Sequence, residues 1–110
     1  MLSAESRQEK SEFIYSSLRD DPDFVELLSF FVDELPEKQS VLRALGQTCE
    51  FNELKREAHK LRGSAGGYGF QGLSDLAGRL EDSCKNSVRD EIAILRNLAE
   101  LLHYLDNVRT

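Results

Sequence analysis

The feature that most constrains the fold is a set of amphipathic segments, in which apolar residues recur every three or four positions. The first segment keeps one helical register from residue 24 to residue 45, with apolar residues at Phe24, Leu28, Phe31, Leu35, Leu42 and Leu45. Pro36 interrupts it and removes one helical hydrogen bond. Because the register continues across the proline, it favours one long kinked helix over two helices that meet at the sequence ELPE.

Short motifs predict the ends of this helix. Asp21 suits the N-cap, Pro22 the first helical position and Asp23 the positive end of the helix dipole. We therefore expect the helix to begin near residue 22. Gly46, in the sequence LGQTCE, predicts where it stops.

Two further segments form a pair around a glycine-rich corner, GGYGF. The first begins near Glu50 or Phe51 and carries its apolar stripe at Phe51, Leu54, Ala58, Leu61 and Ala65. The second carries its stripe at Phe70, Leu73, Leu76, Ala77, Leu80 and Cys84. The short turn between them predicts an antiparallel helical hairpin.

The last segment opens at the sequence SVRD. Ser87 suits the N-cap, and Asp90 stands three residues later, which is a capping-box arrangement. The predicted apolar face comprises Ile92, Leu95, Ala99 and Leu102, broadened by Leu98, Leu105 and Val108.

Four amphipathic helices with short connections bury their stripes most economically as an antiparallel four-helix bundle, so the expected fold class is all-α. The 110 residues suffice for one such domain. We place the bundle at residues 20–108, after an N-terminal extension or short helix at residues 1–19. Within that extension, the sequence SEFIYSSL is consistent with a short helix that lays Ile14 and Leu18 against the bundle.

Charge and composition narrow the range of partners. The formal net charge is −6, so the chain should repel phosphate backbones and anionic lipids, and we expect neither nucleic acid nor membrane as a partner. The N-terminus lacks the pattern of a signal peptide, and no stretch approaches about 20 apolar residues, which predicts a cytoplasmic protein. Cys49 and Cys84 are interpreted as reduced thiols, Cys49 in a turn and Cys84 in the core, although a disulfide between them stays open.

The sequence EAHKLRGSAGGYGF, residues 57–70, places a histidine on the polar side of its helix. At about 100° per residue, His59 points roughly 120° away from the centre of the apolar stripe, so it should face outward. Five residues at helical spacing surround it: Lys55, Arg56, Arg62, Gly63 and Gly66. The histidine thus stands in a basic patch that is partly free of side chains.

Each part of this patch has a use if His59 meets a phosphoryl group. A neutral imidazole nitrogen is a competent nucleophile near pH 7, and Lys55 and Arg62 would offset the phosphoryl charge. Gly63 and Gly66 each cost about 1 kcal/mol in a helix interior relative to alanine, which close approach of another protein would explain. From spacing alone, a solvated helix face with glycines near its C-terminus explains the same residues, so both interpretations stay open at this point.

The run AHKLRGSAGGYGFQGLSDLAGRLE, residues 58–81, resembles the histidine-containing phosphotransfer (HPt) domains of two-component phosphorelays. It is similar to their signature His-x-Leu-Lys-Gly-Ser, followed by a glycine-rich corner and a helix that ends in Leu-Glu. Together with the helix count and the chain length, the likeness extends over about residues 20–108.

This resemblance implies roles for individual residues. His59 would accept the phosphoryl group, and Gly63 would be the small residue that lets a receiver domain approach. Arg62 stands where the family usually has lysine, which keeps the positive charge but places it in a planar fork. Glu81 lies where family members often place a polar residue that reaches the histidine ring; its alternative role is a solvated charge.

The implied function is a phosphoryl shuttle in a two-component system. His59 would take a phosphoryl group from the aspartyl phosphate of one response-regulator receiver domain and pass it to another, in a relay that starts at a hybrid sensor kinase. The Mg²⁺ would come from the receiver's acidic pocket, so we expect no cofactor or metal site in this chain. The chain lacks a glycine-rich nucleotide loop, so it should be a stoichiometric carrier and not an enzyme.

Three alternatives fit the sequence less well. A non-phosphorylated helical adaptor would only dock a receiver or kinase, and the intact His59, Arg62 and Gly63 argue against it. Dimerisation domains of histidine kinases typically follow the histidine with an acidic residue, whereas this sequence has Lys60, which favours a monomeric HPt protein. A metal site using His59 and His103 lacks the spacing of bundle metal sites, and His103 is expected to flank the core of the last helix.

Overall fold

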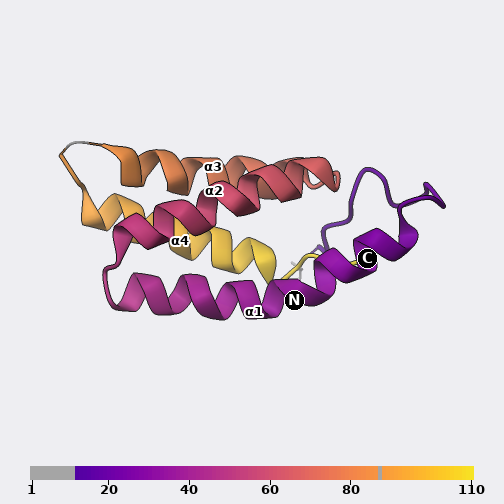
Figure 1. Cartoon of the computed structure of the whole chain (residues 1–110), viewed down its shortest axis with the longest axis horizontal. Coiled ribbons are helices and arrows are strands. Elements are labelled where there is room, and N and C mark those ends of the chain that lie inside the picture. Colours follow the sequence, from indigo (N-terminus) through magenta and orange to yellow (C-terminus); the bar gives the residue numbers. More distant parts are fainter. Residues whose placement is uncertain (1–11, 87) are drawn as a thin grey trace, which may run out of the picture.

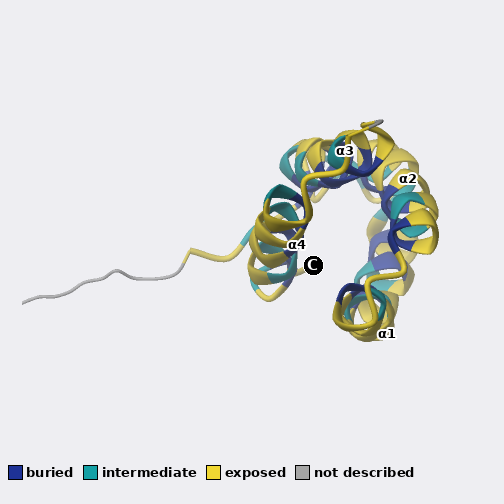
Figure 2. Cartoon of the chain, turned by 90° about the vertical axis from the view of Figure 1, so that its left-hand side faces the viewer, coloured by how far each residue is buried: buried dark blue, intermediate teal, exposed yellow. Residues whose placement is uncertain are grey.

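The fold is an antiparallel bundle of four helices, as the apolar periodicity predicts (Figure 1). A computed structural model of the chain describes residues 12–86 and 88–110. The helices are α1 (Val25–Gln47), α2 (Phe51–Gly67), α3 (Gln71–Lys85) and α4 (Glu91–Leu105). Each helix packs against the next one in the chain, and α4 returns to pack against α1, which Figure 2 shows from one end of the bundle. The all-α prediction is therefore confirmed.

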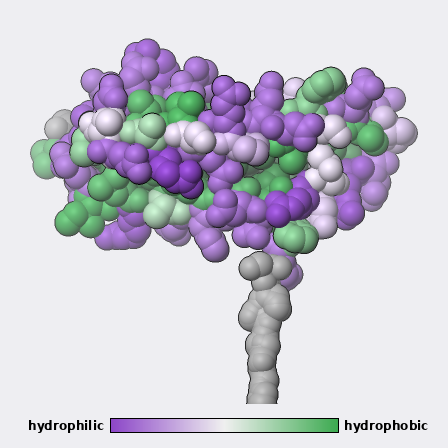
Figure 3. Space-filling view, turned by 90° about the horizontal axis from the view of Figure 1, so that it is seen from below, coloured by the Kyte–Doolittle hydropathy of each residue, from purple (hydrophilic) through white to green (hydrophobic). Residues whose placement is uncertain are grey.

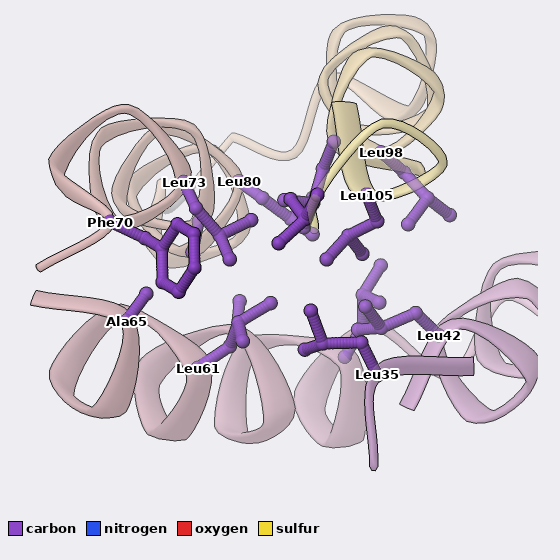
Figure 4. Packing of buried hydrophobic residues seen from close by; sticks show 14 of the residues in the cluster. Leu35, Leu42, Leu61, Ala65, Phe70, Leu73, Leu80, Leu98 and Leu105 are labelled. Carbon is purple, nitrogen blue, oxygen red and sulfur yellow. The ribbon is translucent and has the colours of Figure 1, made fainter. Parts of the chain in front are cut away.

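The hydrophobic core lies between the helices and contains leucine side chains from all four of them (Figure 4). The predicted stripe of α2 is buried in full, from Phe51 through Leu54, Ala58 and Leu61 to Ala65. On α3 the predicted stripe is also buried, except that Leu76 is only partly covered. These two helices turn their remaining faces to solvent, and the candidate site lies there.

Helix α1 is one helix with Pro36 inside it, which confirms the choice of one helix over two. It begins at Val25, so the predicted start near residue 22 is wrong. Asp21 closes a turn instead, because its carbonyl oxygen accepts from the Phe24 amide at 3.0 Å and its side chain accepts from the Asp23 amide at 3.0 Å. The Asp21 side chain, which the sequence predicts as the N-cap of this helix, therefore stabilises the turn before it.

Gly46 does not stop α1 but lies within it, because the helix continues to Gln47. A Cβ atom on Gly46 would collide with the Leu98 side chain of α4, so this glycine permits close packing of the two helices. The chain turns at Cys49, which has a φ of 55°. Cys49 is exposed at this turn and Cys84 is buried in the core, as predicted, and both are free cysteines in the structure.

Helix α4 differs most from the prediction. It begins at Glu91, and the Asp90 side chain is its N-cap, accepting from the Ala93 amide at 3.1 Å. The predicted start at the sequence SVRD is therefore wrong, and Ser87 lies outside the described residues. The buried face is Ile94, Leu98, Leu101 and Leu105.

The apolar face predicted for α4 is correct only in part: Leu98, Leu105 and Val108 are buried, and Leu102 is half-buried, but the other three residues are exposed. Ile92 is 74% exposed and Leu95 40%, and Ala99 is exposed as well. Leu95 and Ala99 line a groove between α4 and the end of α1. Figure 3 shows hydrophobic residues gathered towards the left of the molecule in that view. His103 is also exposed, so its predicted place beside the core is wrong. Helix α4 is apolar over more than half of its circumference, so periodicity alone did not select the buried face.

Residues 12–18 form a strap, without helix up to residue 16 and in a turn from residue 17, and not the short helix considered for this segment. The Ile14 amide donates to the Asn107 carbonyl at 2.7 Å, and the Arg109 amide donates to the Ile14 carbonyl at 2.8 Å. The Ser17 amide donates to the Gly69 carbonyl at 2.9 Å, at the corner between α2 and α3. Ile14 pairs with Val108 in an isolated parallel bridge and packs against the core, as predicted for its side chain.

The corner between α2 and α3 depends on Gly69, whose φ of +82° favours glycine. A side chain there would also meet the strap, since Ser16 Oγ lies 2.5 Å from the position of a Cβ. The hairpin predicted from GGYGF is therefore confirmed. No helix in the described part of the chain is both long enough and apolar enough to span a membrane.

Candidate functional site

His59 projects from the middle of α2 into solvent, with 72% of its side chain exposed. The neighbouring residues Ala58 and Leu61 point into the core and hold this stretch of helix in place. The outward direction predicted from the helical projection is therefore the observed one. An exposed imidazole on a rigid helix is accessible to a second protein.

Glu81 is the buried residue of the site. It extends from α3 towards α2, and only 3% of it is exposed. Its Oε2 accepts from His59 Nδ1 at 2.9 Å, and its Oε1 accepts from Arg62 Nη1 at 3.2 Å. Lys85, one turn further along α3, places its Nζ 3.2 Å from the same Oε2. One buried carboxylate thus joins three basic side chains from two helices, which excludes the alternative of a solvated charge.

Burial opposes ionisation of Glu81, but hydrogen bonds from Lys85, His59 and Arg62 outweigh it, and the pKa of Glu81 lies below its ordinary value of 4.5. The carboxylate is therefore ionised at neutral pH and can only accept hydrogen bonds. Nδ1 of His59 must then carry the proton, and in the neutral ring Nε2 has the free lone pair. The Glu81 contact consequently fixes both the orientation of the ring and the nitrogen that faces solvent.

Arg62 contacts Glu81 directly, which the helical spacing on α2 does not predict. Its side chain crosses α3 at Gly78, where a Cβ would lie 3.2 Å from Arg62 Nε. Its carbonyl oxygen accepts from Ser74 Oγ at 2.8 Å, which fastens α2 to α3 beside the site. The Arg62 side chain is 48% exposed, and Glu81 uses one of the five N–H donors of its guanidinium.

Lys55 and Arg56 line an open depression together with Asn52, His59 and Glu81. Arg56 forms an ion pair with Glu53 on its own helix, at 3.0 Å. The structure therefore brings Lys55 and Arg56 to the same depression as His59, as the helical spacing predicts. Neither contacts Glu81 directly in the hydrogen bonds and ion pairs described for it.

The two glycines of the predicted patch have different surroundings. Gly63 is exposed, and a Cβ built there would have no atom within 4 Å. Gly66 would place its Cβ 3.4 Å from Ser74 Oγ, an ordinary contact within the α2–α3 interface. Packing within the described chain therefore requires glycine at neither position, because a Cβ would meet open space at Gly63 and make only an ordinary contact at Gly66.

Sequence reasoning missed Lys85, Gly78 and Ser74. The spacing of Glu81 and Lys85, four residues apart on one helix, was a usable signal for the first. A second signal was the position of Glu81 itself, which lies on the buried side of α3 with Ala77 and Cys84.

In residues 12–86 and 88–110, no three or more histidine, cysteine or acidic side chains are grouped so that they could hold a metal ion.

The fold and the site define a four-helix bundle that presents a histidine held by a buried carboxylate. The family model described as Hpt domain matches residues 26–110, and the chain belongs to this family. Neither curated proteins nor solved structures gave a match. The family confirms the resemblance seen in residues 58–81. Hpt domains are phosphotransfer modules of two-component systems and interact with response-regulator receiver domains.

Proposed function

We propose that this chain is a phosphoryl carrier that accepts a phosphoryl group on His59 from a receiver-domain aspartate and passes it to a second receiver. The observation that carries the proposal is the hydrogen bond from His59 Nδ1 to Glu81 Oε2, at 2.9 Å. It leaves Nε2 as the nucleophilic nitrogen on an accessible helix face.

The chemistry follows from this geometry. The Nε2 lone pair attacks the phosphorus of the aspartyl phosphate, an N–P bond forms, and the P–O bond to the aspartate breaks. The receiver keeps the electron pair as a carboxylate, and the ring keeps its Nδ1 proton, which faces Glu81. The positive charge that develops on the ring is stabilised by the Glu81 carboxylate. The second transfer runs the same steps in reverse towards another aspartate.

Basic side chains support the phosphoryl group in this proposal. Arg62 lies one turn from His59 with its side chain 48% exposed, and Lys55 lines the depression that contains His59. A phosphoryl group brings negative charge that these cations offset. The Mg²⁺ that such transfers use would be held by the receiver's acidic pocket, and the first phosphoryl donor would be a hybrid sensor kinase.

Gly63 supplies the clearance that transfer requires. In-line attack needs the receiver's phosphorylated aspartate to reach Nε2, so the receiver must lie close to the surface of α2. The open space around Gly63, one turn from His59, permits that approach.

The test is phosphoryl transfer from a radiolabelled receiver domain to this chain. We expect label on the wild type, and none on His59→Gln, which keeps the helix and a polar side chain but has no imidazole. Arg62→Ala should accept label more slowly while its circular dichroism stays that of the wild type. Transfer that survives His59→Gln, or label that resists acid, would disprove the proposal. A receiver that binds the wild type without transfer would support the adaptor instead.

A further inference from the structure

Lys85 is a basic residue of the site that was not among the residues predicted from the sequence. It lies four residues after Glu81 on α3, with its side chain 52% exposed. Its Nζ is 3.2 Å from Glu81 Oε2, the oxygen that also accepts from His59 Nδ1 at 2.9 Å. Lys85 and His59 therefore share one carboxylate oxygen.

We propose that Lys85 is a positioning residue that acts through Glu81: it neutralises the carboxylate and so keeps His59 unprotonated at Nε2 near neutral pH. This inference rests on the proposed function, because an unprotonated Nε2 matters only if His59 is a nucleophile. It adds a residue and a pH dependence to that function.

The charge balance supports this role. A carboxylate beside an imidazole favours the protonated ring, and a doubly protonated ring has no lone pair with which to attack phosphorus. Glu81 carries one negative charge, and Arg62 on Oε1 with Lys85 on Oε2 supplies two positive charges before the ring is counted. With Lys85 in place, Glu81 orients the ring without drawing a second proton onto it. Consistent with this, Lys85 contributes most among the hydrogen bonds that lower the pKa of Glu81.

Other charged groups near the site have different contacts. From α2, Lys55 lines the depression, Arg56 pairs with Glu53, and Lys60 pairs with Glu57 at 2.9 Å. From the segment before α4, Arg89 donates to Asn52 at the edge of the depression. In the part of the chain that the structure describes, Arg62 and Lys85 are the two fixed cations in direct contact with Glu81.

The experiment compares Lys85→Met and Lys85→Arg with wild type, and uses Lys60→Met as the matched control. Lys60→Met also removes one positive charge next to His59 in sequence, but its partner is Glu57. The first readout is the pH titration of the His59 ring by NMR, which needs no receiver. The second is the pH profile of the initial rate of phosphoryl acceptance.

We expect Lys85→Met to raise the midpoint of the ring titration by about half a pH unit, a screened effect at an exposed ring. Acceptance at pH 6 should then fall about threefold relative to wild type, whereas acceptance at pH 8.5 should not fall. Lys85→Arg should keep the wild-type midpoint of the ring titration and the wild-type acceptance at pH 6. Lys60→Met should shift the midpoint less than Lys85→Met does.

Two results would overturn the inference. One is an unchanged ring titration in Lys85→Met, and the other is an equal loss of acceptance at every pH, which would indicate direct contact of Lys85 with the phosphoryl group. If the wild type accepts no phosphoryl group, the proposed function fails, and the ring titration alone then decides whether Lys85 controls protonation of His59.

Discussion

The carboxylate of Glu81 lies 2.9 Å from Nδ1 of His59, and this contact joins a buried residue of α3 to an exposed residue of α2. The orientation of the imidazole therefore depends on the packing of two helices and not on α2 alone. Ser74 and Gly78 keep those helices close, because Ser74 bonds the Arg62 carbonyl and Gly78 leaves room for the Arg62 side chain. The site is rigid where it holds the ring and open where a partner approaches.

Glu81 should make stability depend on pH. Its folded-state pKa lies below the ordinary value of 4.5, so the ionised carboxylate stabilises the fold; this contribution is complete above about pH 4.5 and is lost as the pH falls through the folded-state value. We expect Glu81→Gln to cost about 1–2 kcal/mol at pH 7 and much less near pH 3. Urea unfolding at both pH values measures this, and an equal cost at both would contradict the assignment.

Two glycines should respond to alanine in opposite directions. Gly63 is in a helix interior with open space around it, so Gly63→Ala should stabilise the protein by up to about 1 kcal/mol. Gly46 meets Leu98, so Gly46→Ala should destabilise by about 1–3 kcal/mol through overpacking. Thermal unfolding of the two variants checks this, and a loss of stability in Gly63→Ala would show that Gly63 has a structural role.

Gly63 should matter for docking although it does not matter for packing. Gly63→Gln fills the space beside His59, and we expect it to weaken binding of a receiver domain about tenfold, or about 1.4 kcal/mol. Gly67→Gln is the matched control, since Gly67 is also exposed on α2 with no atom within 4 Å of a Cβ, but it lies two turns from His59. Titration calorimetry with a receiver measures both, and equal affinities for Gly63→Gln and wild type would contradict the clearance argument.

The two cysteines should differ in reactivity. Cys49 is exposed, whereas Cys84 is buried, and burial raises the pKa of the Cys84 thiol. Because the thiolate is the reactive form, a maleimide at pH 7 should label Cys49 rapidly and Cys84 only after unfolding. Mass spectrometry of the labelled protein counts the adducts. Rapid double labelling of the folded protein would show that α3 opens readily.

The parts of the fold that sequence predicts best are those with one possible buried face. Helix α2 carries apolar residues on one side only, so its core stripe and the outward direction of His59 both follow from periodicity. Helix α4 offers two apolar faces, and the burial of Ile94 and Leu101 in place of Ile92 and Leu95 depends on where α1 and α3 lie. Periodicity holds no information about that choice.

The candidate site could likewise be predicted only where its residues lie on one helix. Residues within one helical turn of His59 could be placed by spacing, because they share its helix. The resemblance indicated that Glu81 could reach the ring, but the roles of Lys85 and Gly78 come from contacts between α2 and α3, which depend on how the two helices pack. The strap escaped prediction for a similar reason, since backbone hydrogen bonds from Ile14 and Ser17 to distant segments hold it.

The most direct test of the central claim is an NMR spectrum of the imidazole nitrogens after transfer from a phosphorylated receiver. If the Glu81 contact holds Nδ1 and presents Nε2, the phosphoryl group should be on Nε2 of His59, and Nδ1 should keep its proton. His103, which is exposed on α4, is an internal control and should remain unmodified. Phosphorylation of Nδ1, of His103 or of any residue other than His59 would contradict the account.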